Sequence, residues 1–204
     1  MPTQQERIAK TKAAITAALV HVGSTKPLTQ ITVSDLTRAS GISRGTFYLH
    51  YLDKEDLVTQ LETYFTNRLQ QLLTNEIDGA MDYREWTKGR PYPIITDVIA
   101  LAAEDKELLR FLFGINGDPD FTRDVTARLQ TAIVKELTRV KGNGNFRHDI
   151  PREYALNLVT NAIMTIVTTW LVSADDMPQD AVAALIMRAL YLSPYDILGI
   201  TISK

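Results

Sequence analysis

The stretch "SGISRGTFYLHY", residues 40–51, decides the fold of the first quarter of this chain. A polar helical segment ends at Gly41, and a second segment, predicted to be helical over 44–51, begins three residues later. Glycine suits the turn between them because it tolerates a positive φ. Together with an amphipathic helix that ends near residues 21–23, the pattern predicts three helices joined as a helix-turn-helix.

The helix predicted over 44–51 has two faces when it is projected at about 100° per residue. Phe47 and Tyr51 share one arc, which we expect to pack inward, and His50 lies at its margin. The opposite arc is expected to face solvent and carries Arg44, Gly45, Tyr48 and Leu49. Arginine can donate to guanine edges, and an aliphatic group can touch a thymine methyl. This face therefore indicates reading of DNA in the major groove.

Capping signals set the neighbouring helices. Thr32 precedes the helix that ends at Gly41, and Asp35 follows three residues later, which is a variant of the capping box. Asp53 is predicted to cap a long fourth helix. Its apolar residues recur at helical spacing and are Leu57, Leu61, Tyr64, Phe65, Leu69 and Leu72.

The segment "ITVSDLTRASGISRGTFYLHYLDKEDLV", residues 31–58, resembles the DNA-binding region of TetR-family transcriptional regulators. The residues that carry the resemblance, in unbroken register, are Thr32, Val33, Ala39, Gly41, Ser43, Gly45, Thr46, Phe47, Tyr48, Lys54 and Leu57. The sequence departs from the family pattern at Thr37, where alanine is usual, and at His50, where tyrosine is common.

The resemblance implies roles for individual residues. Base or base-proximal contacts are implied for Arg44, Gly45, Tyr48 and Leu49. Phosphate contacts are implied for Thr32, Ser43, Thr46, His50 and Lys54. For His50 two interpretations stay open, a phosphate donor or a partly buried core residue.

Composition fits a folded domain with a separate polyanion-binding part. The 204 residues are 45% hydrophobic and 23% charged, and there is no cysteine, which excludes disulfides, thiol nucleophiles and cysteine-ligated zinc. Residues 1–54 hold seven basic and three acidic residues, whereas the remainder holds fifteen basic and twenty-one acidic ones. A basic front on an acidic body suggests that the front meets a polyanion, which the acidic body would repel. Without an apolar leader at its N-terminus, the chain is expected to be cytoplasmic.

The periodicity beyond residue 90 is also helical, so we predict an all-α fold of about nine helices. Further helices are expected at 94–104, 106–114, 120–140, 152–174 and 178–192. We predict a helix-turn-helix DNA-binding domain over 1–53, and a helical ligand-sensing and dimerisation domain over 54–204 that begins with the long helix. The tail over 191–204 is apolar and stays unassigned.

Residues 154–174 carry no charge, yet their asparagines and threonines argue against a membrane span. In the family this domain encloses a small-molecule pocket. We hypothesise that one polar stripe lines it, made of Asn157, Asn161, Met164 and Thr168, with apolar walls from Trp86, Phe111 and Phe113. An ordinary core or interface stripe is the alternative. The absence of charge predicts a neutral, largely apolar effector.

The resemblance implies a ligand-responsive homodimeric regulator, most often a repressor, that pairs through its last two helices. Two reading helices would then sit ~34–36 Å apart on a pseudo-palindromic double-stranded DNA operator. The alternative is a co-activator-like module whose second domain docks a protein partner. No catalytic constellation, metal-ligand spacing or cofactor motif is present, so we predict neither an enzyme nor a metal or cofactor site.

Overall fold

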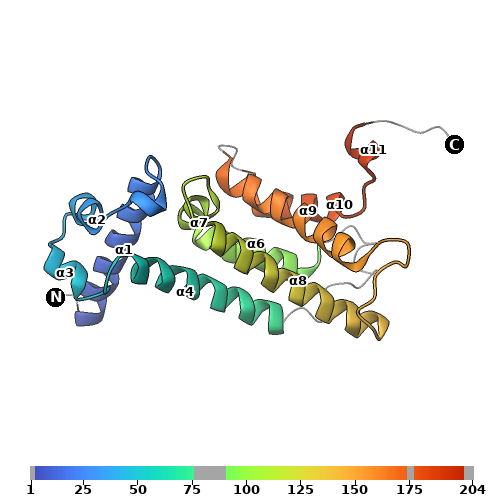
Figure 1. The fold of residues 1–204 in the computed structure, drawn as a ribbon, viewed down its shortest axis with the longest axis horizontal. Coiled ribbons are helices and arrows are strands. Elements are labelled where there is room, and N and C mark those ends of the chain that lie inside the picture. The colour runs from blue at the N-terminus through green and yellow to red at the C-terminus, as the bar shows by residue number, and fades with distance from the viewer. Residues whose placement is uncertain (1–2, 76–90, 174–176, 200–204) are drawn as a thin grey trace. The chain divides into compact units, whose positions relative to one another are not determined.

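The computed structural model describes residues 3–75, 91–173 and 177–199, and these are helical without any strand (Figure 1). This confirms the all-α prediction. The elements are α1 (Gln4–Gly23), η1 (Leu28–Gln30, a 3-10 helix), α2 (Val33–Ser40), α3 (Arg44–Tyr48), α4 (Lys54–Asn75), α6 (Pro93–Glu104), α7 (Lys106–Phe113), α8 (Pro119–Lys141), α9 (Arg152–Val172), α10 (Gln179–Ala189) and α11 (Pro194–Ile197). Each of the nine predicted helices is found, and α11 was not foreseen.

The chain divides into two compact units, and the division differs from the expected boundary after residue 53. The first unit joins Met1–Asn67 to Asp105–Thr122, and the second joins Arg68–Glu104 to Arg123–Lys204. The boundaries therefore fall inside α4, between α6 and α7, and inside α8. The sequence pattern could not show this, because the apolar stripe of α4 runs unbroken through the point where its packing partners change.

The first unit is built around the helix-turn-helix. Phe47 and Leu36 are fully buried between α1, α2 and α3, where α1 contributes Ile15 and Leu19. The predicted capping box of α2 is present, since the Thr32 side chain accepts from the Asp35 amide and the Asp35 carboxylate accepts from the Thr32 amide. Gly41 follows α2 with φ 71°, the left-handed conformation that glycine adopts most readily.

Helix α7 belongs to this first unit and closes the end of α1. The Leu28 amide donates to the Asn116 carbonyl at 2.8 Å, and the Asn116 side chain donates to the Gly23 carbonyl at 3.1 Å. The ring of Phe111 lies against Gly23, where any side chain would overlap it. Gly23 thus permits close contact between α1 and α7. From the sequence, this residue was predicted only to mark the end of a helix.

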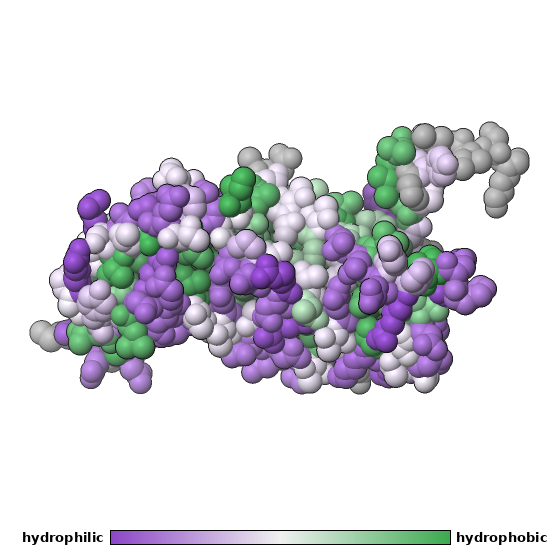
Figure 2. Space-filling model, in the orientation of Figure 1, coloured by the Kyte–Doolittle hydropathy of each residue, from purple (hydrophilic) through white to green (hydrophobic). Residues whose placement is uncertain are grey.

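The second unit packs α6, α8, α9 and α10 with the C-terminal part of α4. Its most buried side chains include Ile99, Leu171, Val182 and Ile186. Helix α10 packs on both α6 and α9, and the Trp170 indole donates to the Met177 carbonyl at 2.9 Å between α9 and α10. Beyond α10, hydrophobic atoms are exposed on the segment that carries α11 (Figure 2).

Candidate DNA interface and ligand cavity

Helix α3 is a single short turn whose start is fixed by its own side chains. The Ser43 hydroxyl accepts from the Thr46 amide at 3.0 Å, as an N-cap, and lies 2.9 Å from the Thr46 hydroxyl. The helix ends at Tyr48 rather than at 51, because the chain then tightens and the His50 amide bonds the carbonyl three residues back, on Phe47. The Leu52 amide donates to the Asp56 carboxylate of α4 at 2.8 Å.

The two predicted faces of this segment are seen in the structure. Phe47 is completely buried and meets the Tyr48 ring edge to face at 5.6 Å, and Tyr51 is buried beside it. Arg44, Gly45 and Tyr48 are exposed, and Leu49 is 82% exposed. An apolar side chain left so open on a packed helix is available to another surface. We call the solvent-facing residues Ser43, Arg44, Gly45, Tyr48 and Leu49 the reading face.

Leu52 was not predicted as a site residue, yet it is 81% exposed just beyond the reading face in sequence. Helical projection from residue 44 could not place it, because the helix has already ended at Tyr48. Its exposure could have been suspected from its position, since Leu52 stands directly before the residue that caps α4. That residue is Asp53, whose side chain accepts from the Asp56 amide at 2.7 Å.

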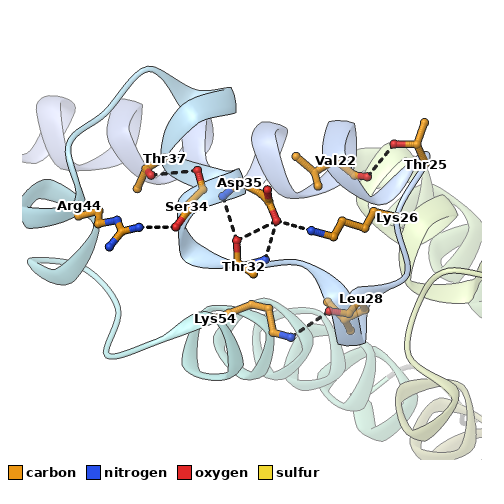
Figure 3. Close-up of polar contacts among 10 residues, drawn as sticks. All are labelled: Val22, Thr25, Lys26, Leu28, Thr32, Ser34, Asp35, Thr37, Arg44 and Lys54. Carbon is orange, nitrogen blue, oxygen red and sulfur yellow. Dashed lines mark hydrogen bonds and ion pairs between the residues drawn. The ribbon is translucent and has the colours of Figure 1, made fainter.

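Arg44 and Thr32 both form hydrogen bonds with side chains of α2 (Figure 3). The Arg44 guanidinium donates to the Ser34 hydroxyl, so its direction is set by α2. The Thr32 hydroxyl donates to Asp35 at 2.8 Å and accepts from the Asp35 amide at 3.2 Å. Thr32 is exposed, but its hydroxyl already serves the cap. A phosphate contact from Thr32 therefore remains a prediction.

Asp35 is the centre of this polar cluster. Its carboxylate accepts from the Lys26 ammonium at 2.5 Å and from the Thr32 amide at 3.0 Å. The hydrogen bond from Lys26, followed by those from Thr32, lowers the pKa of Asp35 to about 2. The cluster links the chain before η1 to the start of α2. It therefore helps to position α2, on which α3 and its reading face pack.

The Lys54 side chain is mostly buried and is directed toward η1. Its ammonium donates to the Leu28 carbonyl at 2.9 Å and lies 3.1 Å from the Glu55 carboxylate, and its side chain is only 12% exposed (Figure 3). A phosphate contact from Lys54 stays a prediction, because an ammonium has three donors and the Leu28 carbonyl of η1 accepts from one of them. His50 is half-buried, with its ring 6.4 Å from that of Tyr51, which leaves both interpretations of it open.

A partly open cavity of about 300 Å³ lies among the helices of the second unit. Its walls come from α6, α8, α9 and α10, with Leu73 from α4 and Tyr92 before α6. The lining residues are Leu73, Tyr92, Ile94, Ile95, Val98, Ile99, Leu129, Ile133, Glu136, Val159, Ile163, Val167, Ile186, Leu190 and Tyr191. Such a volume and such an apolar lining are typical of small-molecule sites.

The polar stripe predicted on α9 does not line this cavity. Asn157 and Asn161 are exposed, and the Gln130 side chain donates to the Asn157 carbonyl oxygen at 2.9 Å. Met164 and Thr168 are half-buried, and the Thr168 hydroxyl donates to the Met164 carbonyl. Helix α9 turns its apolar arc inward instead, because buried amides would need partners that an apolar wall does not supply.

The predicted aromatic walls lie elsewhere as well. Phe111 and Phe113 belong to the first unit, where Phe111 covers Gly23 and the ring of Phe113 is tilted against that of Phe121, with their centroids 5.0 Å apart. Neither lines the cavity. The predicted contact of Trp86 lies outside the described residues. The prediction of these aromatic walls was wrong because it relied on closeness in sequence. Helices α6 and α7 are adjacent in the chain but belong to different cores.

Glu136 is the cavity residue that the sequence argument missed. It is fully buried, and both of its carboxylate oxygens accept from the Arg139 guanidinium at 2.6 Å. The sequence did hold a sign of this. Glu136 follows Leu129 and Ile133 at helical spacing, so it lies on their face of the helix, and an arginine follows three residues later. The wall of the cavity therefore contains a charge, unlike the charge-free helix from which a neutral effector was predicted.

The remaining polar atoms of the lining come from two tyrosines. The hydroxyls of Tyr92 and Tyr191 lie 3.0 Å apart and join the segment before α6 to the end of α10. Among the described residues, no group of three or more His, Asp or Glu side chains could hold a metal ion.

Two family models match the chain. Residues 15–61 match "Bacterial regulatory proteins, tetR family", and residues 89–191 match "Transcriptional regulator C-terminal region". The chain is 30% identical to the HTH-type transcriptional repressor Rv1474c of Mycobacterium tuberculosis over 158 residues, which cover 76% of this chain and 78% of Rv1474c. It is 43% identical to the uncharacterized HTH-type regulator YxbF of Bacillus subtilis over 136 residues, 66% of this chain but only 34% of YxbF.

Solved structures with the same fold include two regulators. The fatty acid degradation regulator FadR from Bacillus halodurans has a TM-score of 0.60 at 18% identity, covering 88% of this chain and 94% of FadR. A TetR-family regulator from Syntrophomonas wolfei has a TM-score of 0.61 at 14% identity, covering 94% of this chain and 99% of that one. At such identities the likeness concerns the fold alone. With both family models and Rv1474c, the helix-turn-helix and the helical second unit establish that this chain is a member of the TetR family of bacterial transcriptional regulators, DNA-binding proteins without enzymatic activity.

Proposed function

We propose that this TetR-family regulator binds a pseudo-palindromic operator as a homodimer and represses transcription until a small apolar effector enters the cavity of the second unit. The observation that carries the DNA-binding part is the reading face, whose exposed Leu49 and Arg44 stand on a buried Phe47. The relative Rv1474c, which is named a repressor, supports repression as the direction of control.

The reading face has the chemistry that base recognition needs. Arg44 offers a planar fork of donors, and its contact with Ser34 reduces the conformational freedom lost on binding. Tyr48 and Leu49 offer an aromatic and an aliphatic surface for thymine methyl groups, and Gly45 lets the backbone approach. Ser43 and Thr46 lie at the helix N-terminus, where amides and hydroxyls favour a phosphate.

The outer surface of α9 supports a homodimer. By length and composition α9 could cross a membrane, and only 22% of its most apolar window is buried within the chain. A core helix of a globular protein can have the same length and composition. The exposed face of α9 carries Asn157, Asn161 and Thr165 together with Leu158, which is 67% exposed. Such a mixed stripe suits a second copy of α9 better than lipid. We propose that α9 and α10 pair there.

The cavity supports an effector as the signal. A partly open, apolar cavity of about 300 Å³ between helices suits a small molecule, which favours a sensor over a protein-docking module. Helix α6 lines this cavity, and the chain passes from Glu104 directly into α7, which packs on α1 in the first unit. A ligand that prefers one position of α6 would therefore shift the equilibrium between two arrangements of the chain.

The test is selection of bound duplexes from a random DNA pool with the purified full chain, followed by titration of the recovered sequence. We expect an inverted repeat, as two copies of the reading face require. Arg44→Ala should weaken binding by about 1–3 kcal/mol and relax specificity at one base pair per half-site. The matched control is Arg147→Ala, which removes an exposed arginine paired with Asp149 in the second unit and should leave affinity unchanged. Unchanged affinity of Arg44→Ala would refute the role of the reading face.

A further inference from the structure

The chain continues past α10 into a short segment, residues 192–199, which we call the C-terminal arm. Its single helical turn, α11, is capped by its own residues. The Ser193 amide donates to the Asp196 carboxylate at 2.9 Å, and the Asp196 amide donates to the Ser193 hydroxyl at 3.2 Å. Gly199 ends the turn with φ 71°, and its amide donates to the Asp196 carbonyl at 3.1 Å. Local hydrogen bonds therefore set the shape of the arm.

This arm carries large apolar side chains into solvent (Figure 2). They are 38–70% exposed and are Leu192, Tyr195, Ile197 and Leu198. The only charge within residues 192–199 is Asp196, whose carboxylate already serves the cap. A membrane surface or DNA would favour lysine or arginine beside such side chains, and the arm has neither. An apolar patch of this kind is typical of a contact with another protein surface.

The first two turns of α9 present a matching apolar surface. Tyr154 and Leu158 are each 67% exposed and lie four residues apart, on one face of the helix. Helix α10 has 11 residues, about 16 Å, whereas α9 has 21 residues, about 31 Å. Because α10 begins beside the end of α9, where the Trp170 indole reaches the Met177 carbonyl, it covers only the later part of α9. The start of α9 thus extends past the end of α10, from which the arm leaves (Figure 1).

Within one chain these two apolar surfaces do not cover each other. Both are exposed, and α11 stands clear of α9 and α10 (Figure 1). A two-fold pair of chains can cover them, because such an interface uses the same patches on both copies and makes each contact twice. The six side chains expose on the order of 100 Å² each. Two copies would then bury roughly 1,200 Å², the lower end of the range for a stable interface.

We propose that the C-terminal arm docks on a second copy of this chain, where Tyr195, Ile197 and Leu198 cover Tyr154 and Leu158 of that copy's α9. The exchange is reciprocal, so each chain gives one arm and receives one. This inference rests on the homodimer of the proposed function. It adds to the pairing of α9 and α10 a segment that closes the part of α9 that α10 leaves uncovered.

Chemical cross-linking of the full chain tests this placement, since the chain has no cysteine of its own. Two differently tagged copies are co-expressed, one with Leu198→Cys and one with Tyr154→Cys, and are treated with a short bismaleimide. We expect about fivefold more product carrying both tags than when Gln179→Cys replaces Tyr154→Cys, because docking raises the effective concentration of the two thiols. Gln179 is the matched control, exposed at the opposite end of the α9 and α10 pair. Equal yields would refute the placement.

A second measurement follows the strength of the dimer by sedimentation equilibrium. Ile197→Ser combined with Leu198→Ser should raise the dimer dissociation constant about tenfold or more, because two apolar side chains no longer leave water on pairing. Ile115→Ser is the matched control, since Ile115 is fully exposed between α7 and α8, and its loss should leave the constant unchanged. An equal change in both proteins would contradict a specific role for the arm.

The remaining outcomes separate this inference from the function on which it rests. If one chain that carries both Leu198→Cys and Tyr154→Cys is cross-linked only within itself, the arm covers its own α9 and the inference is refuted. If the wild-type chain dimerises but neither the cross-link nor the serine variant behaves as expected, the arm serves another partner, and the inference fails while the homodimer stands. If the wild-type chain stays monomeric at every concentration, the homodimer of the proposed function fails together with the inference.

Discussion

The two units of this regulator carry their candidate sites in opposite ways. The first unit exposes its site on a few consecutive residues, Ser43 to Leu49, which a buried Phe47 holds from below. The second unit forms its site as a partly open cavity between helices, and the cavity wall combines residues that range in sequence from Leu73 to Tyr191. The comparison teaches that a recognition surface can be encoded locally, whereas a cavity depends on how several helices pack.

The largest effect is expected for Phe47→Ala. Phe47 is completely buried, and removal of a buried phenylalanine ring destabilises by about 3–5 kcal/mol. Chemical denaturation should show this loss, and hydrogen exchange should place it in α1 to α3 rather than in the second unit. Leu49→Ala is the control, since Leu49 is 82% exposed and its truncation should change stability by less than about 0.5 kcal/mol. A uniform loss of protection across both units would contradict the assignment of Phe47 to the core of the first unit alone.

The next effect tests the proposed dimer face of α9. Leu158→Glu places a charge on the exposed stripe and should raise the dimer dissociation constant about a hundredfold or more, because an interface carboxylate without a partner is costly. Sedimentation equilibrium measures this constant. Thr131→Glu, an equivalent exposed change on α8, should leave it unaltered. Equal dissociation of both variants would remove α9 from the interface.

Two glycines separate structural need from surface function. A Cβ at Gly23 would lie 2.2 Å from the Phe111 ring, so Gly23→Ala should destabilise by about 1–3 kcal/mol. Gly45 has only the Ser43 hydroxyl nearby, at 3.6 Å, so Gly45→Ala should leave thermal stability unchanged or slightly higher, yet weaken operator binding.

Thermal melts and operator titrations measure both variants. Adding Phe111→Leu to Gly23→Ala should restore part of the loss by making room for the new methyl group. If Gly23→Ala melts like the wild type, α7 does not hold α1 as closely as described.

The smallest effect concerns pH and the Asp35 cluster. The pKa of Asp35 is lowered to about 2, chiefly by Lys26, so its ionised form is favoured in the folded chain. The resulting stability is fully present above its unfolded pKa of about 4 and is lost as pH falls toward 2. Asp35→Asn should therefore lower the melting temperature at pH 7, and the difference from wild type should shrink at pH 3. Asp124→Asn serves as a control, and a difference that grows with acid would reverse the assignment.

The helix-turn-helix was predictable in detail because its determinants lie close together in the chain. Thr32, Asp35 and Gly41 act on residues within one turn of themselves, and the structure has each in the expected role. The face of Arg44 and Leu49 followed from helical projection alone. Lys54 was the exception, since its ammonium reaches Leu28, which lies 26 residues earlier. Its contact depends on how η1 meets α4, and no local pattern reports that.

The cavity was less predictable because the same helix offers two faces to a core. On α9 the arc of Val159 and Ile163 and the arc of Asn157 and Asn161 were both visible in the sequence. Which arc faces inward depends on α6, α8 and α10, which come together only in the folded second unit. Glu136 was overlooked for a related reason, since i,i+3 ion pairs are usual on exposed helix surfaces.

The all-helical fold, the helix-turn-helix within residues 31–58 and the outward face of Arg44, Gly45, Tyr48 and Leu49 could all be predicted from the amino-acid sequence. Those features follow from backbone preferences, caps and helical period, all of which act within a few residues. Tertiary structure alone decided that α7 joins the first unit, that Lys54 turns inward, and that Glu136 lines a cavity. Those features depend on close packing between distant segments, because a side chain's surroundings are set by every helix that reaches it.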